Sequence, residues 1–203
     1  MNKLITMIKN KRIIVSTIFA IILLILGLFW LANNKSAPVQ GSSEDYRIAD
    51  GKVTNSKAGV SYNVPQGWTA EKLDYDQGSI MLYSSETDAK KTESGGIQLP
   101  LENGCLINTG IIYEDYSIED MKIEALYLGD SMGASTSSFD SLVTGGIPSL
   151  KYAFESQKTG KVNVVYIPKD GRIASFALYL PTSGDQTKCL EDFGNFLGTV
   201  SIK

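Results

Sequence analysis

The hydrophobic pattern of the chain begins with one long uncharged stretch, residues 13–32 (Ile13 to Ala32). It reads IIVSTIFAIILLILGLFWLA and contains no ionisable side chain. A helix of that length covers about 30 Å, the thickness of the hydrocarbon core of a bilayer. Helix is also the conformation in which a single segment satisfies its own backbone amides in lipid. The pattern therefore predicts a transmembrane helix over Ile13 to Ala32, with the lipid bilayer as its partner.

After residue 45 the pattern changes to short apolar runs bounded by turn residues, which is typical of β-strands. Three consecutive runs, at residues 150–155, 162–167 and 172–180, are joined by short turns at Thr159-Gly160 and at residues 168–171. Such short connections force neighbouring strands to be antiparallel, so we expect a meander. The other strand candidates are residues 46–49, 60–64, 79–84, 104–113 and 199–202.

Two segments carry the three- and four-residue apolar spacing of helices. The first has Ser117 as its N-cap and Gly129 as the residue that ends it. The second begins at Ser183 or Asp185, where Ser183 and Gln186 have the spacing of a capping box, and ends at residue 197. The expected apolar stripes are Ile118, Met121, Ala125 and Leu128 in the first helix, and Leu190, Phe193, Phe196 and Leu197 in the second.

Strands and helices are segregated rather than alternating, so the predicted fold class is α+β, an antiparallel sheet flanked by helices. The remaining connections are rich in small and polar residues. Residues 33–44 predict a flexible linker, and residues 131–141 predict a mobile connection. The chain is thus divided into a basic N-terminus at 1–12, an anchor at 13–32, the linker, and one domain at 45–203.

Charge indicates the orientation of the predicted anchor. Four basic residues precede it within residues 1–12, and only Lys35 follows it closely. Positive charge stays on the cytoplasmic side, so we expect a single-pass cell-membrane protein with a cytoplasmic N-terminus and an extracytoplasmic C-terminal domain. The alternative is a cleavable signal peptide, whose apolar core is normally shorter. In either case the domain is exported.

The exported part of the chain is acidic. Residues 1–35 hold five of the 19 basic residues and none of the 22 acidic ones, which leaves 14 basic and 22 acidic side chains in the remainder. Nucleic acids require basic patches on their protein partners, so the sequence argues against nucleic acid as a partner.

Cys105 and Cys189 are the two cysteines of the chain, and both lie in the exported part. An even pair outside the cytoplasm predicts one disulfide, which here closes a loop of more than 80 residues. The alternative is two buried free thiols that behave as small apolar side chains.

The sequence offers no catalytic or metal-binding constellation. It has no histidine, which excludes His-dependent triads and His-containing zinc sites. Residues 74–78 begin like a calcium loop but lack its later ligands. Ser137 and Ser138 have no plausible base, and nothing in the sequence pairs Lys188 with a serine. Capping and solvation explain the acids around the first helix, Glu114, Asp115, Glu119 and Asp120. We therefore expect no enzyme activity, no metal and no cofactor.

The chain resembles the PsbP-like superfamily, named for an extrinsic subunit of the photosynthetic oxygen-evolving complex. The resemblance rests on residues 59–68, GVSYNVPQGW, on the meander, and on FLGTV at residues 196–200 after the last helix. It implies an α-β-α sandwich around an antiparallel sheet, used as a binding or assembly module without known chemistry. Metal binding in photosynthetic members relies partly on histidine, so it does not carry over. Trp68 is expected to pack on the core rather than to stack on a ligand.

The combination of anchor, linker and compact domain predicts a membrane-anchored extracytoplasmic binding or assembly domain without catalytic activity. Its partner is expected to be an envelope protein or a small ligand. The alternative is a pilin-like subunit of a surface filament, although the glutamate usual near the start of a pilin helix is missing here. A hydrolase that uses carboxylates ranks lowest.

Overall fold

The computed structural model describes residues 39–40, 42–73, 78–88, 97–137 and 139–203. The predicted anchor at Ile13 to Ala32 and the basic N-terminus lie outside these residues. Residues Pro38–Lys203 form one compact unit. No helix in the described part of the chain is long and apolar enough to cross a membrane.

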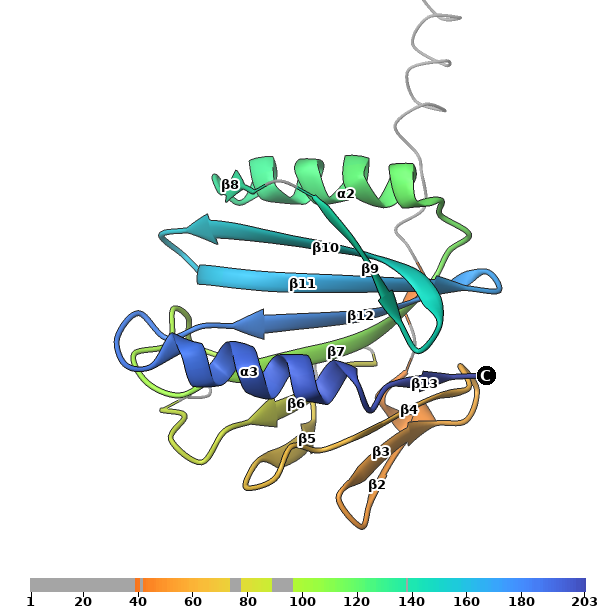
Figure 1. The fold of residues 1–203 in the computed structure, drawn as a ribbon, viewed down its shortest axis with the longest axis horizontal. Helices are drawn as coiled ribbons and strands as arrows, with labels where there is room; N and C mark the ends of the chain where they lie inside the picture. The colour runs from red at the N-terminus through yellow and green to blue at the C-terminus, as the bar shows by residue number, and fades with distance from the viewer. Residues whose placement is uncertain (1–38, 41, 74–77, 89–96, 138) are drawn as a thin grey trace, which may run out of the picture. The chain divides into compact units, whose positions relative to one another are not determined.

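The larger sheet is antiparallel, with nine strands within the described residues (Figure 1). Its path runs β5-β6-β7-β12-β11-β10-β8, with β1 paired to β7 and β9 paired to β10. The predicted meander is confirmed as β10, β11 and β12. The strand bounds are β1 Val39–Gln40, β5 Thr69–Lys72, β6 Ile80–Tyr83, β7 Leu106–Tyr113, β8 Ser135–Thr136, β9 Asp140–Thr144, β10 Ile147–Ser156, β11 Gly160–Lys169 and β12 Arg172–Tyr179.

A smaller antiparallel sheet has the order β13-β4-β3-β2. Its strands are β2 Tyr46–Ala49, β3 Lys52–Asn55, β4 Val60–Asn63 and β13 Ser201–Ile202. The 3-10 helix η1, Ser43–Asp45, precedes it. The sheet joins the first part of the domain to the last, because β13 pairs with β4.

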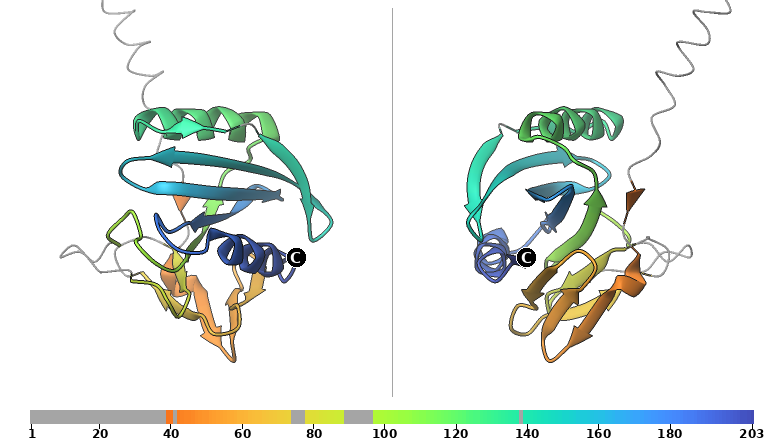
Figure 2. Two further views of the ribbon diagram at one scale, coloured as in Figure 1. Left: turned by 60° about the vertical axis from the view of Figure 1, so that its left-hand side comes forward. Right: turned by 90° about the vertical axis from the view of Figure 1, so that its right-hand side faces the viewer.

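The two described helices, α2 (Ile118–Ser131) and α3 (Gln186–Leu197), cover opposite faces of the larger sheet (Figure 2). Successive side chains of β11 point to opposite faces of the sheet, so they pack alternately on the α2 side and on the α3 side. Val162, Val164 and Tyr166 pack in the core cluster that contains α2, whereas Val165 and Ile167 pack in the cluster that contains α3 and the smaller sheet. The predicted α+β class is confirmed, with the sheet between the helices.

Helix α2 begins as predicted but ends later. Ser117 and Asp120 form a capping box. The helix continues past Gly129 to Ser131, and the glycine with positive φ is Gly133. Gly129 is needed for packing instead, because a Cβ there would lie 2.5 Å from the hydroxyl of Thr136 on β8.

Helix α3 ends at its predicted residue and starts after Asp185, one of its two predicted starts. Asp185 is the N-cap and accepts from the amide of Thr187. The predicted capping box of Ser183 and Gln186 is wrong, because both side chains bond to loop carbonyls, of Glu102 and Pro181. The buried stripe is Cys189, Phe193 and Phe196, and Leu190 is exposed.

Several segments that were expected to be irregular are short strands. Strand β8 lies within residues 131–141 and β9 begins there, and the two strands pair with different parts of β10. Strand β1 lies inside the predicted linker and pairs with the end of β7. Each of these strands completes the hydrogen bonding of a longer neighbour.

Buried tyrosines predict a loss of stability at high pH. The hydroxyls of Tyr62 and Thr109 are hydrogen-bonded, and Tyr152 donates to Tyr166 at 3.1 Å. Burial raises the pKa of all three tyrosines above the ordinary value of about 10. In the unfolded chain they ionise near that value, so the unfolded state binds fewer protons there than the folded state. The contribution of these tyrosines to stability is therefore fully present below about pH 10, and it is lost as the pH rises further.

The measurement is the urea midpoint as a function of pH, followed together with tyrosinate absorbance. We expect the urea midpoint to decline steeply above about pH 10. The tyrosinate absorbance should rise over the same pH range in which the domain unfolds. Tyr62→Phe removes one of these groups and should make the decline shallower. Ionisation of the buried tyrosines in a folded protein with an unchanged midpoint would contradict the prediction.

Candidate functional site

A groove of about 550 Å³ runs along one side of α3. Its opposite wall comes from the turn at residues 63–68 and from the loops at 84–86 and 103–105. We call it the disulfide groove, because Cys105 and Cys189 both line it. Its volume lies in the range of small-ligand pockets, about 300–1,000 Å³.

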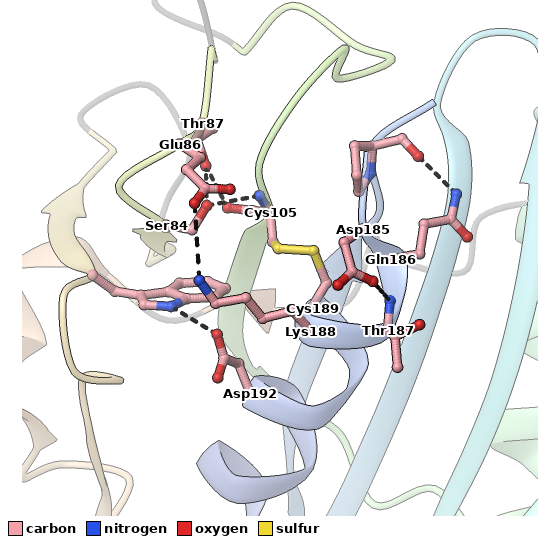
Figure 3. The surroundings of a disulfide bond; sticks show 12 residues. Ser84, Glu86, Thr87, Cys105, Asp185, Gln186, Thr187, Lys188, Cys189 and Asp192 are labelled. Atoms are coloured by element: carbon pink, nitrogen blue, oxygen red, sulfur yellow. Dashed lines mark hydrogen bonds and ion pairs between the residues drawn. A yellow bond between two sulfur atoms is a disulfide. The ribbon is translucent and has the colours of Figure 1, made fainter. Parts of the chain in front are cut away.

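The predicted disulfide is confirmed in the structure, between Cys105 and Cys189 (Figure 3). The two Cα atoms are 5.9 Å apart, within the usual range for a bridge. The bond joins α3 to the segment just before β7, across a sequence separation of 84. It therefore ties the two walls of the groove together.

Hydrogen bonds fix the second wall of the groove to Cys105 (Figure 3). The Cys105 amide donates to Ser84 Oγ at 2.9 Å, and its carbonyl accepts from the Ser84 amide at 3.0 Å. The same carbonyl accepts from Thr87 Oγ1 at 2.7 Å. Because these bonds hold the loop at residues 84–87, the groove is largely preformed.

Charged side chains and one indole line the groove, and they lie near the disulfide in Figure 3. Trp68 Nε1 donates to Asp192 Oδ2 at 3.4 Å. Lys188 Nζ and Glu86 Oε1 are 3.9 Å apart across the groove, and both side chains are mostly exposed. An exposed pair of this kind contributes about 0–1 kcal/mol, so it opens readily. Trp68 packs partly against the core, as predicted, and also lines the groove.

The acidic residues and serines that the sequence offers as candidate catalytic or metal-binding groups do not line this groove. Asp120 caps α2, and Glu119 pairs with Lys122 at 3.1 Å on the same helix. Ser137 Oγ accepts from the Ala153 amide. Ser138 and residues 74–77 of the calcium-like segment lie outside the described residues. No group of three metal-ligating side chains occurs in the part of the chain that the structure describes.

The arrangement is suited to binding a polar ligand. Glu86, Asp185 and Asp192 supply three carboxylates, Lys188 supplies one ammonium group, and Trp68 supplies an aromatic wall. The sequence singles out Lys188 and Trp68 as possible functional residues, and Asp185 only as a possible helix start. Asp192 and Glu86 carry no local signal, because the groove is assembled from segments more than 100 residues apart.

No protein-family model and no curated protein matches the sequence. Among solved structures, the chain is similar to cyanobacterial PsbP from Synechocystis, with a TM-score of 0.48 and 11% identity, over 77% of this chain and 95% of that chain. It is also similar to a protein from Bacteroides thetaiotaomicron, with a TM-score of 0.43 and 15% identity. That match covers 81% of this chain and about half, 49%, of the other. The predicted resemblance is confirmed to this extent: the chain is similar in structure to cyanobacterial PsbP.

Proposed function

We propose that this protein is a non-catalytic binding or assembly domain, held at the extracytoplasmic face of the cell membrane by Ile13 to Ala32. Its partner is a basic, extended segment of an envelope protein, which binds in the disulfide groove. The single observation that carries the proposal is the groove itself, whose lining includes three carboxylates, an indole and a disulfide.

The rigidity of the groove supports a binding role. A site whose walls are already fixed loses little conformational freedom when a ligand binds, and this favours affinity. Here the disulfide and the three hydrogen bonds at Cys105 hold both walls. The half-exposed indole of Trp68 adds the kind of large rigid surface that dominates the energetics of protein interfaces.

The charge of the groove supports a basic partner. Glu86, Asp185 and Asp192 line the groove together with a single lysine, Lys188, so its lining is acidic. Opposite charge on the partner steers association and favours the correct register. The weak pair of Lys188 and Glu86 can separate, and Glu86 is then free to accept from a lysine or arginine of the partner.

The test is site-specific photo-crosslinking of the full chain in its own cells. A crosslinking amino acid at Gln66 or Asn195, both exposed on the rim of the groove, should capture one and the same envelope protein. The same amino acid at Gln157, in the exposed turn between β10 and β11, should not. Combining Glu86→Gln with Asp192→Asn should lower the crosslink by about tenfold, because it removes two charges and preserves shape.

The matched control is Glu155→Gln, an exposed carboxylate on β10 outside the groove, which should leave the crosslink unchanged. Equal capture at Gln66 and Gln157, or no effect of the double neutralisation, would contradict the proposed groove. Protease added outside wall-stripped cells should remove the domain. A domain that stays intact under these conditions would contradict the proposed anchoring.

A further inference from the structure

A second groove lies on the other side of α3, between that helix and β9. We call it the β9 groove, and its volume is about 500 Å³. Its walls are mainly apolar and include two side chains that are unusually exposed for their type, Val143 at 70% and Leu190 at 42%. The other apolar lining residues are Leu142, Phe193 and Leu197.

Two buried polar groups among the lining residues of this groove have no hydrogen-bond partner within the described residues. They are the amide nitrogen of Asn163 and the hydroxyl of Thr144, on residues that are only 7% and 5% exposed. An unpaired buried donor lowers stability, whereas an apolar side chain of similar shape at Asn163 would not. Because the fold alone gains nothing from these groups, they point to a bound molecule.

A cation lies beside them. Strand β10 pairs with β11 so that Lys151 is opposite Val165 and Ala153 is opposite Asn163. Lys151 and Asn163 are therefore diagonal neighbours on the face of the sheet that α3 covers. Lys151 lines the groove, is half-buried, and forms no ion pair within the described part of the chain.

We infer that the β9 groove binds a small amphiphile, a single apolar chain with a carboxylate head such as a fatty acid anion. The apolar walls receive the chain. Lys151 supplies the counter-charge, and Asn163 and Thr144 supply hydrogen bonds to the carboxylate oxygens. A pocket with mostly apolar walls and a few convergent polar groups is the usual form of such a site. This inference is independent of the disulfide groove.

Gly194 allows the groove to be blocked without disturbing the fold. It lies within α3 and lines the β9 groove, and a Cβ added to it would meet nothing within 4 Å. Gly194→Leu should therefore place its side chain in the groove. Gly194→Ala is the matched control, because it raises helix propensity by a similar amount and adds only a methyl group.

The experiment uses the full chain in lipid nanodiscs, photolabelled with a diazirine derivative of dodecanoate, with the labelled peptides mapped by mass spectrometry. Label should appear on residues 142–145 or 190–198, and dodecanoate should compete at least about tenfold better than dodecanol, which has no charge. Lys151→Gln should remove that preference. Gly194→Leu should abolish the label, and Gly194→Ala should retain it.

Asn163→Leu gives an independent readout. It should raise the melting temperature, because it removes an unpaired buried donor. It should also weaken the binding of dodecanoate by about fivefold, because a hydrogen bond to the carboxylate is lost. Absence of label in the groove of the wild-type chain would overturn the inference, as would label that survives Gly194→Leu. Equal competition by dodecanol would overturn the assignment of a carboxylate head.

Discussion

Removal of the Cys105–Cys189 disulfide is expected to lower the free energy of unfolding by about 4 kcal/mol. The bridge spans a sequence separation of 84, so its loss returns a large amount of conformational entropy to the unfolded chain. Domains of this size are stable by only about 5–15 kcal/mol, so the loss is a large fraction of the total. The measurement is urea unfolding of the double variant Cys105→Ala, Cys189→Ala beside the oxidised wild type.

Reduction of the wild type by dithiothreitol provides the control. It should lower the stability of the wild type to that of the double variant and leave the double variant unchanged. The double variant should still fold, because α3 keeps its apolar contacts. Phe196 packs against Tyr62 and Phe176 with ring centroids 5.3 and 5.4 Å away. An unchanged midpoint in the double variant would show that the bridge does not constrain the fold.

The parts of the fold with strong local signals could be predicted from the sequence. The hairpin between β11 and β12 turns at Asp170 and Gly171, which both have positive φ. This geometry is the one that Asp-Gly favours between two strands. The disulfide could also be predicted, because the chain has two cysteines and both follow the predicted anchor.

The short strands could not be predicted, because their pairing depends on a distant neighbour. Two residues bury too little surface to show a period, so β1 and β8 form only where β7 and β10 present unpaired backbone groups. The sequence also misplaced the end of α2, because Gly129 serves a close contact with Thr136 rather than a turn.

The sequence contains a local signal for the β9 groove but none for the disulfide groove. The disulfide groove brings Trp68 to Asp192, and no local pattern links these residues. In the β9 groove, Asn163 interrupts an otherwise apolar strand, VNVVYI, which is buried on both faces. A polar residue at such a position requires a partner, and this is a signal that sequence reasoning can use.

Helix α3 connects the two proposals. Cys189 attaches it near its N-terminus, and Phe193 and Phe196 bury its middle against the larger and smaller sheets. Lys188 and Asp192 line the disulfide groove, while Leu190 and Gly194 line the β9 groove. One well-fixed helix thus positions both sets of side chains. A change that shifts α3 should affect both grooves, whereas Gly194→Leu should affect the β9 groove alone.

Gly104→Ala is expected to destabilise the domain by at least about 3 kcal/mol, through backbone overlap and the cost of a left-handed residue together. Gly104 has φ +72, and its Cβ would lie 2.4 Å from backbone atoms of Thr87, which cannot move aside as a flexible side chain could. Gly51 is the matched control. It has φ +69 and open space around its Cβ, so Gly51→Ala should cost only about 1–2 kcal/mol. Urea unfolding of both variants measures the difference. If the two costs are equal, the close contact between residues 87 and 104 does not exist, and the second wall of the disulfide groove is not held in the way described.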